Sequence, residues 1–224
     1  MNQRLFRFRV AALLGAVCAW WCGAGWGSAA LAASEARPNI LFVLADQWRA
    51  QAFGYAGDPN VKTPHLDRLR RQSVHFVNAV SGVPVCCPAR ASLLTGRRPL
   101  THGVFMNDVP LAPDAITMAK GLGQAGDDTG YIGKWHVDGH GRSNFIPRER
   151  RQGFDYWKVL ECTHSYNNSF YYADEPVKLK WEGYDAIAQT RDARQYLRDH
   201  ARSNKPFFLL DRKSTRLNSS HIPL

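Results

Sequence analysis

The sequence has few cysteines, no long apolar run beyond its first residues, no lysine-rich run and no alternation of aromatic with basic residues. Five cysteines in 224 residues do not make a disulfide scaffold. The missing basic and aromatic patterns argue against a nucleic-acid-binding protein. No internal repeat or low-complexity linker divides the chain. These absences leave an ordinary folded domain, and we expect no nucleic-acid partner.

The N-terminus has the pattern of an export signal. Arg4, Arg7 and Arg9 precede the apolar stretch 10–21, and small residues then lead to Ala32. A membrane-spanning helix needs about 20 consecutive apolar residues, and glycines interrupt this stretch. We therefore expect residues 1–32 to be a cleaved signal peptide on a secreted or periplasmic protein, with no stable membrane span.

The C-terminus carries a second segment to be set apart. Residues 211–221 resemble the translation of a common sequencing adapter, and they follow an apolar strand pattern at 207–210. We predict that residues 211–224 are non-native and that the natural protein continues beyond Leu210. The leader contributes three arginines and the tail two net positive charges, so of the net charge of +10 a net +5 remains for residues 33–210. That charge suits an anionic substrate or a basic surface.

The rest of the chain alternates strand and helix patterns. The apolar run 39–45 predicts a strand buried on both faces, with Asp46 at its carboxyl end. Further along we expect helices from Thr63-Pro64, over 88–95, 115–125 and 184–201, and strands at 74–80, 131–137 and 207–210. The helix at 184–201 has the clearest amphipathic pattern, which places Ile187, Arg191, Tyr196 and Leu197 near a helical period. Such alternation predicts an α/β fold, a mainly parallel sheet sandwiched between helices. Ligands bind such sheets beyond the carboxyl ends of their strands.

The segment from Cys86 to Arg97 reads Cys-Cys-Pro-Ala-Arg-Ala-Ser-Leu-Leu-Thr-Gly-Arg. Pro88 opens a helix, which places Cys86 at the helix N-terminus, where free N–H groups and the helix dipole attract anions. Arg90 follows one turn later on the same face, where it can brace the Cys86 side chain. Taken alone, the cysteine pair favours a vicinal disulfide or two buried small side chains over a functional site.

Cys-x-Pro-x-Arg followed five residues later by Thr-Gly and a basic residue resembles the signature of the sulfatase family. The resemblance implies a truncated alkaline-phosphatase-like fold. It also implies that Cys86 is oxidised to formylglycine by a formylglycine-generating or equivalent maturation enzyme, and that the hydrate supplies the nucleophilic oxygen. Ala89 stands where the family usually has serine. We expect this departure to weaken recognition by that enzyme.

Residues 38–47 together with 63–69 look like the opening of the same family, in which acidic residues after the first strand bind a divalent cation. By this resemblance Asp46 is a metal ligand and formylglycine 86 another, and the metal is calcium, with magnesium as the alternative. Gln47 takes the position of a second aspartate, and its amide oxygen can still ligate a hard cation. The competing interpretations are an N-cap for Asp46 and a solvated amide for Gln47.

Residues 130–136, Gly-Tyr-Ile-Gly-Lys-Trp-His, are similar to the family's Gly-Lys-Trp-His box. Residues two apart on a strand face the same side, so Lys134 and His136 are expected to enter the site together as catalytic groups. The alternative is that both side chains lie on an exposed face of the strand. Asn107 is a candidate substrate-binding residue, although Asn-Asp is also ordinary loop chemistry.

The resemblance thus implies a hydrolase of sulfuric esters, with Cys86, Arg90, Lys134 and His136 catalytic, acting on a sulfated small molecule or a sulfated glycan. One alternative is a phosphodiester or phosphonate monoester hydrolase of the same superfamily. Another is a catalytically incomplete chain with a binding or structural role, because a hard cation wants four or more ligands and this sequence offers two or three. We expect residues 33–210 alone to be inactive.

Overall fold

The computed structural model describes residues 37–213. The chain divides into two compact units, residues 1–37 and 38–224, and the fold below is that of the second. The predicted signal peptide at 1–32 and residues 214–224 lie outside the described part. Within the described range no helix has the length and apolar character needed to cross a membrane.

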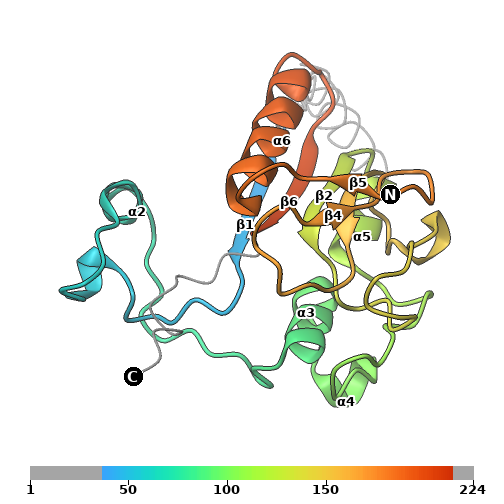
Figure 1. Cartoon of the computed structure of the whole chain (residues 1–224), viewed down its shortest axis with the longest axis horizontal. Coiled ribbons are helices and arrows are strands. Elements are labelled where there is room, and N and C mark those ends of the chain that lie inside the picture. Colours follow the sequence, from blue (N-terminus) through green and yellow to red (C-terminus); the bar gives the residue numbers. More distant parts are fainter. Residues whose placement is uncertain (1–36, 214–224) are drawn as a thin grey trace, which may run out of the picture. The chain divides into compact units, whose positions relative to one another are not determined.

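Four parallel strands form the main sheet, in the order β1-β6-β2-β3 (Figure 1). A separate antiparallel pair joins β4 to β5. The strands are β1 (Ile40–Ala45), β2 (Asp128–Lys134), β3 (Tyr156–Leu160), β4 (Phe170–Tyr171), β5 (Leu179–Lys180) and β6 (Phe207–Lys213). The helices are η1 (Gly54–Ala56), α2 (Pro64–Arg71), α3 (Cys86–Thr95), α4 (Pro99–His102), α5 (Met118–Gln124), η2 (Arg148–Arg150) and α6 (Asp185–His200).

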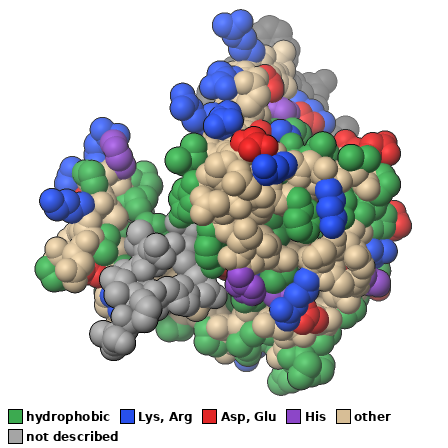
Figure 2. Space-filling view, in the orientation of Figure 1, with side chains coloured by type: hydrophobic (Ala, Val, Ile, Leu, Met, Phe, Trp, Pro, Cys, Tyr) green, Lys and Arg blue, Asp and Glu red, His purple; other side chains and the backbone are tan. Residues whose placement is uncertain are grey.

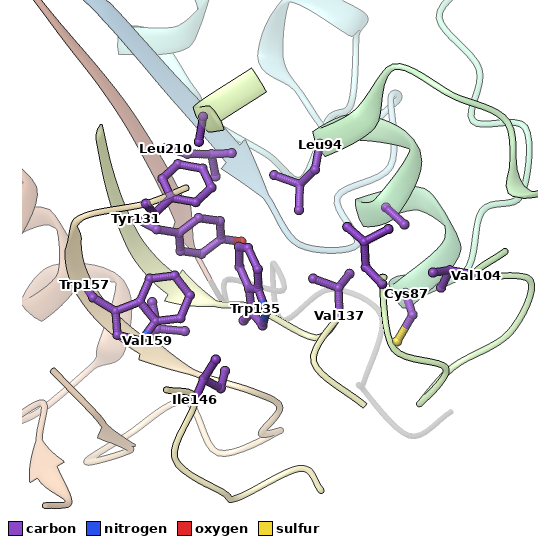
Figure 3. Close-up of a cluster of buried hydrophobic side chains, with 14 of the residues drawn as sticks. Cys87, Leu94, Val104, Tyr131, Trp135, Val137, Ile146, Trp157, Val159 and Leu210 are labelled. Atoms are coloured by element: carbon purple, nitrogen blue, oxygen red, sulfur yellow. The ribbon is translucent and has the colours of Figure 1, made fainter. Parts of the chain in front are cut away.

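Alternate residues of the central strands supply two separate cores, one on each face of the sheet. Tyr131 of β2 and Phe208 of β6 pack with α3 and α5 in one cluster, whose side chains Figure 3 shows. Their neighbours Ile132 and Leu209 pack against α6 in the other. Side chains of a strand alternate between its faces, so apolar runs in the central strands fill both cores. The predicted sandwich of a mainly parallel sheet between helices is confirmed.

Two apolar segments differ from their predictions. β1 lies at an edge of the four-stranded sheet, and Leu41 and Val43 are 46% and 59% exposed, so the strand is not buried on both faces. Residues 74–80 do not form the predicted strand, and within them Phe76 is 77% exposed. An apolar run becomes a strand only where a neighbour accepts its hydrogen bonds, and within the described part residues 74–80 have no such neighbour.

Helix α6 is present as predicted but buries a different face. Its buried side chains include Ala188, Ala193 and Tyr196, whereas Ile187 is 62% exposed. The predicted period had placed Ile187 and Arg191 with Tyr196. The outer face instead gathers basic side chains along the helix (Figure 2), and a shallow hollow there is lined by Ala186, Ile187, Thr190, Arg191, Arg194 and Arg198.

Candidate active site

Helix α3 begins at Cys86, two residues before the predicted start at Pro88, and ends at Thr95, as predicted, where Gly96 adopts a left-handed conformation. The two adjacent thiols have different environments. Cys86 is half-buried, whereas Cys87 belongs to the apolar core (Figure 3). The Cys87 Sγ accepts a hydrogen bond from the Asp108 N–H (3.3 Å). Burial raises the pKa of Cys87 to about 11. Both thiols are free, which rules out the vicinal disulfide in this structure.

Cys86 opens onto a hollow of about 390 Å³ beyond the carboxyl end of β1. The hollow is lined by Asp46, Gln47, Ser81, Pro84, Val85, Cys86, Ala89 and Arg212. Both predicted metal-binding side chains and the predicted nucleophile position thus border one space. Among residues 37–213, however, no three His, Cys, Asp or Glu side chains gather as a metal site.

Three cations surround the Asp46 carboxylate. Its Oδ1 lies 3.2 Å from Arg90 Nη2 and 2.7 Å from Arg212 Nη2, and its Oδ2 lies 3.4 Å from Lys134 Nζ. Burial alone would raise the pKa of Asp46, but the charges of Arg212, Arg90 and Lys134 outweigh it and lower the pKa to about 2. Asp46 is therefore ionised at any physiological pH, and its surroundings carry excess positive charge.

Arg90 ties the first turns of α3 to the end of β2. Its side chain is 3% exposed, and Nη1 donates to the backbone carbonyls of Lys134 (2.7 Å) and Trp135 (3.1 Å) while Nη2 reaches Asp46. Burial and then the charge of Arg212 lower its pKa below the usual arginine value. The fixed fork of the guanidinium suits this three-way contact, which a lysine cannot reproduce.

His136 lies beside this cluster, but it is not on the strand that the sequence predicted over 131–137. Strand β2 ends at Lys134, and His136 adopts a left-handed conformation (φ 57°). Its Nε2 is 3.3 Å from Asp108 Oδ1. Burial, followed by the charges of Lys134 and Arg90, lowers the pKa of His136 to about 4, against the opposing effect of Asp108. The buried imidazole is neutral at neutral pH.

Asn107 and Asp108 join the N-terminus of α3 to His136. The Asn107 side-chain oxygen accepts the Cys87 N–H (3.1 Å), so that oxygen caps the helix, and the remaining polar atoms of the amide are the ones left for a substrate. Both carboxylate oxygens of Asp108 accept hydrogen bonds from Arg142 (3.1 and 2.6 Å), and Oδ1 also contacts His136. Arg142 is exposed. The sequence did not identify it as a partner of Asp108, because nothing in its local pattern indicates such a contact.

Backbone strain concentrates at this site. Five non-glycine residues of the described range adopt left-handed conformations, and Gln47, Asp108 and His136 are three of them. Each such residue costs about 1–2 kcal/mol, so the surrounding contacts must stabilise it. Glu161, which follows β3, is one source of such contacts: its buried carboxylate accepts the backbone N–H of His136 at 3.1 Å. Glu161 was also missed by sequence reasoning.

Comparison with known proteins finds sulfatases similar to this chain in sequence and in fold. A sequence model of the sulfatase family matches residues 38–210. An ulvan-active sulfatase of Formosa agariphila is 54% identical over 172 residues, which cover 76% of this chain and 34% of the relative. An N-acetylglucosamine-6-O-sulfatase of Bacteroides thetaiotaomicron is 32% identical, over 78% of this chain and 30% of its own length. The chain therefore spans about a third of these curated relatives.

Solved structures agree. A crystal structure of yidJ from Bacteroides fragilis, a sulfatase candidate, superposes with a TM-score of 0.76 at 29% identity, over 83% of this chain and 46% of that one. BT4656, solved in complex with its substrate D-glucosamine-2-N,6-O-disulfate, gives a TM-score of 0.71 at 30% identity, over 81% of this chain and 35% of that one. These matches do not favour the phosphodiester or phosphonate alternative.

Proposed function

Because the chain belongs to the sulfatase family, we propose that the whole protein hydrolyses sulfuric esters, with residue 86 as the source of the nucleophile. The observation that carries the proposal is that Cys86 and Asp46 line one hollow while Arg90 and Lys134 both contact Asp46. Two buried cations beside a half-buried thiol form a setting for an anionic substrate. They come from α3 and β2, which are far apart in sequence.

The nucleophile position is supported by the local structure of α3. By family resemblance Cys86 is converted to formylglycine, whose hydrate offers a hydroxyl for attack on sulfur. The chain contributes the dipole of a ten-residue helix, which favours negative charge beside residue 86. Asn107 accepts the Cys87 N–H, Pro88 has no N–H, and the Ala89 N–H donates to the Val85 carbonyl. Of the donors in the first turn, the Cys86 N–H is therefore the one left for an anion.

A divalent metal is part of the proposal, as calcium or, alternatively, magnesium. Asp46 and Gln47 offer the oxygen donors that such hard cations prefer, and both line the hollow beside residue 86. When bound, the metal would polarise the sulfate and lower the pKa of the attacking hydroxyl. Six or more donors are usual for calcium, so the residues described here fit only part of the coordination shell.

Arg90 and Lys134 are proposed to stabilise the charge that develops on sulfate oxygens. Both side chains are almost fully buried, and hydrogen bonds hold the Arg90 guanidinium before any substrate arrives. Preorganised charges in a site with little water stabilise a transition state more than mobile surface charges do. Asp46 keeps the two cations together without a substrate, because it contacts both.

His136 is proposed to accept a proton during the reaction. Its pKa of about 4 means that the imidazole is neutral at neutral pH, which suits a base better than an acid. Nδ1 is buried without a hydrogen-bond partner among the described residues, whereas Nε2 faces Asp108. The neutral ring thus retains an accepting nitrogen.

Arg212 is proposed to have no natural role in the site. It belongs to the adapter-like residues 211–221, and the family match stops at Leu210. Residues 211–213 extend β6 and pair with β1 and β2, but backbone pairing does not depend on which side chains the strand carries. We therefore assign the Asp46–Arg212 ion pair to the non-native tail.

The substrate is proposed to be a sulfated glycan, and the protein is proposed to be exported. Two relatives are named for a glycan or an amino sugar, and the net charge of +5 over residues 33–210 suits a polyanion. The leader pattern at 1–32 supports a secreted or periplasmic location. A formylglycine-generating or equivalent enzyme is the expected maturation partner.

Kinetics of the whole protein test the proposal. Cys86→Ala should abolish hydrolysis of an aryl sulfate, since alanine cannot carry the oxygen nucleophile. Cys162→Ala, which also removes a free thiol but one that does not line the hollow, is the matched control and should retain turnover. Undiminished aryl sulfate hydrolysis by a folded Cys86→Ala protein would reject the proposed function.

A further inference from the structure

Glu161 gathers three backbone N–H groups of the loop that follows β2. Its Oε2 accepts from His136 (3.1 Å), and its Oε1 accepts from Asp138 (3.0 Å) and Gly139 (3.1 Å). The side chain is 2% exposed and follows β3 directly. A buried carboxylate is costly unless hydrogen bonds compensate it, and here both oxygens are used.

The loop needs such an acceptor because its backbone departs from the strand. His136 has φ 57° and Gly139 has φ 69°, so neither continues the ladder between β2 and β3. The last ladder bond runs from the Trp135 N–H to the Leu160 carbonyl (2.8 Å). Beyond it, the N–H groups of His136, Asp138 and Gly139 converge on one side and form an anion-binding surface. The chain's own Glu161 occupies that surface.

The direction of His136 depends on this contact. With its N–H held by Glu161, the residue directs its imidazole Nε2 to Asp108, on the side of the α3 N-terminus. We propose that Glu161 is a positioning residue that holds the left-handed backbone of His136 and thereby aims its imidazole at the site. The inference deepens the proposed function, on which the catalytic role of His136 rests.

The chemistry of the contact makes Glu161→Gln the informative variant. Glutamine keeps the shape of the side chain, but its NH₂ group would face a backbone N–H at one of the two positions, leaving two donors opposed. Glu161→Asp keeps the charge and shortens the reach, so it serves if the glutamine variant fails to fold. Glu175→Gln is the matched control, because it makes the same chemical change at an exposed position outside the loop.

Two measurements separate this inference from the proposed function. In the chain itself, amide hydrogen exchange at residues 136, 138 and 139 should accelerate at least about tenfold in Glu161→Gln, and the NMR signals of the His136 ring should shift. In the whole protein, kcat for an aryl sulfate should fall about 10- to 100-fold with KM little changed, since misplacement of a catalytic group affects the chemical step.

The outcomes are distinct. Unchanged ring signals and unchanged exchange in a folded Glu161→Gln or Glu161→Asp protein would overturn the positioning role, whatever the activity. Absence of sulfatase turnover in the unaltered whole protein would instead reject the proposed function, while altered ring signals in Glu161→Gln would still support the positioning of His136.

Discussion

His136 and Glu161 should give the chain opposite dependences of stability on pH. Burial, with Lys134 and Arg90, lowers the pKa of His136 from 6.5 to about 4. The unfolded chain therefore binds the proton more readily in that range, and stability is lost as pH falls from 6.5 towards 4. Burial, with the Asp138 charge, raises the pKa of Glu161 from 4.5 to about 7 against its three backbone hydrogen bonds. Stability is then lost as pH rises from 4.5 towards 7.

The two effects have similar size. Each shift is about 2.5 pKa units, and linkage then changes the free energy of unfolding by about 2 kcal/mol between pH 4.5 and 6.5 for each group, with opposite signs. In the unaltered chain they should nearly cancel. Removing either group should expose the dependence that the other produces.

Urea unfolding followed by tryptophan fluorescence, at several pH values, tests this. His136→Asn tolerates the left-handed backbone and should lose about 2 kcal/mol from pH 4.5 to 6.5, relative to the unaltered chain. Glu161→Gln should gain about as much over the same interval. Glu175→Gln should leave the profile unchanged. Parallel profiles for all four proteins would refute the assigned environments of His136 and Glu161.

Four further tests address the packing and the completeness of the site. Arg90→Met should lower the free energy of unfolding by about 2–4 kcal/mol, because it removes the guanidinium donors to the Lys134 and Trp135 carbonyls and one of the three cations beside Asp46. A loss within error of zero would contradict the structural importance of these contacts. Leu94→Ala, at a 3% exposed core position, should cost about 2–5 kcal/mol by urea unfolding. Gly153→Ala should reduce the melting temperature, since φ is 94° and a Cβ would lie 2.6 Å from the Lys120 nitrogen. Residues 33–210 alone should bind calcium weakly by calorimetry and show no aryl sulfate turnover, whereas robust turnover would show that the site needs nothing further.

Much of the fold follows from local patterns. Pro88 and Gly96 carry the chemistry of a helix start and stop, so the end of α3 could be predicted at its residue and its start to within two residues. The absence of a strand at 74–80 and the choice of the buried face of α6 could not be predicted from local patterns. Both depend on which neighbours are present, and a local period cannot say whether Ile187 or Ala188 meets the sheet.

Part of the candidate site could likewise be predicted from the sequence, and part could not. Asp46, Cys86, Arg90 and Lys134 come together because strand ends and a helix start meet at one edge of a parallel sheet, which topology predicts. The reach of His136 depends on a left-handed turn after the strand, and the contacts of Glu161 and Arg142 depend on loop geometry. No short-range pattern encodes those contacts, because the bonded partners lie more than twenty residues apart in the sequence.

The central claim is that the side chain at position 86 is oxidised and supplies the attacking oxygen. Mass spectrometry of the peptide that contains residue 86, from protein purified from its natural host, tests it most directly. We expect an aldehyde or its hydrate in place of the thiol at Cys86 and an intact thiol at Cys87. An unmodified Cys86 in protein that hydrolyses sulfate esters would contradict the account.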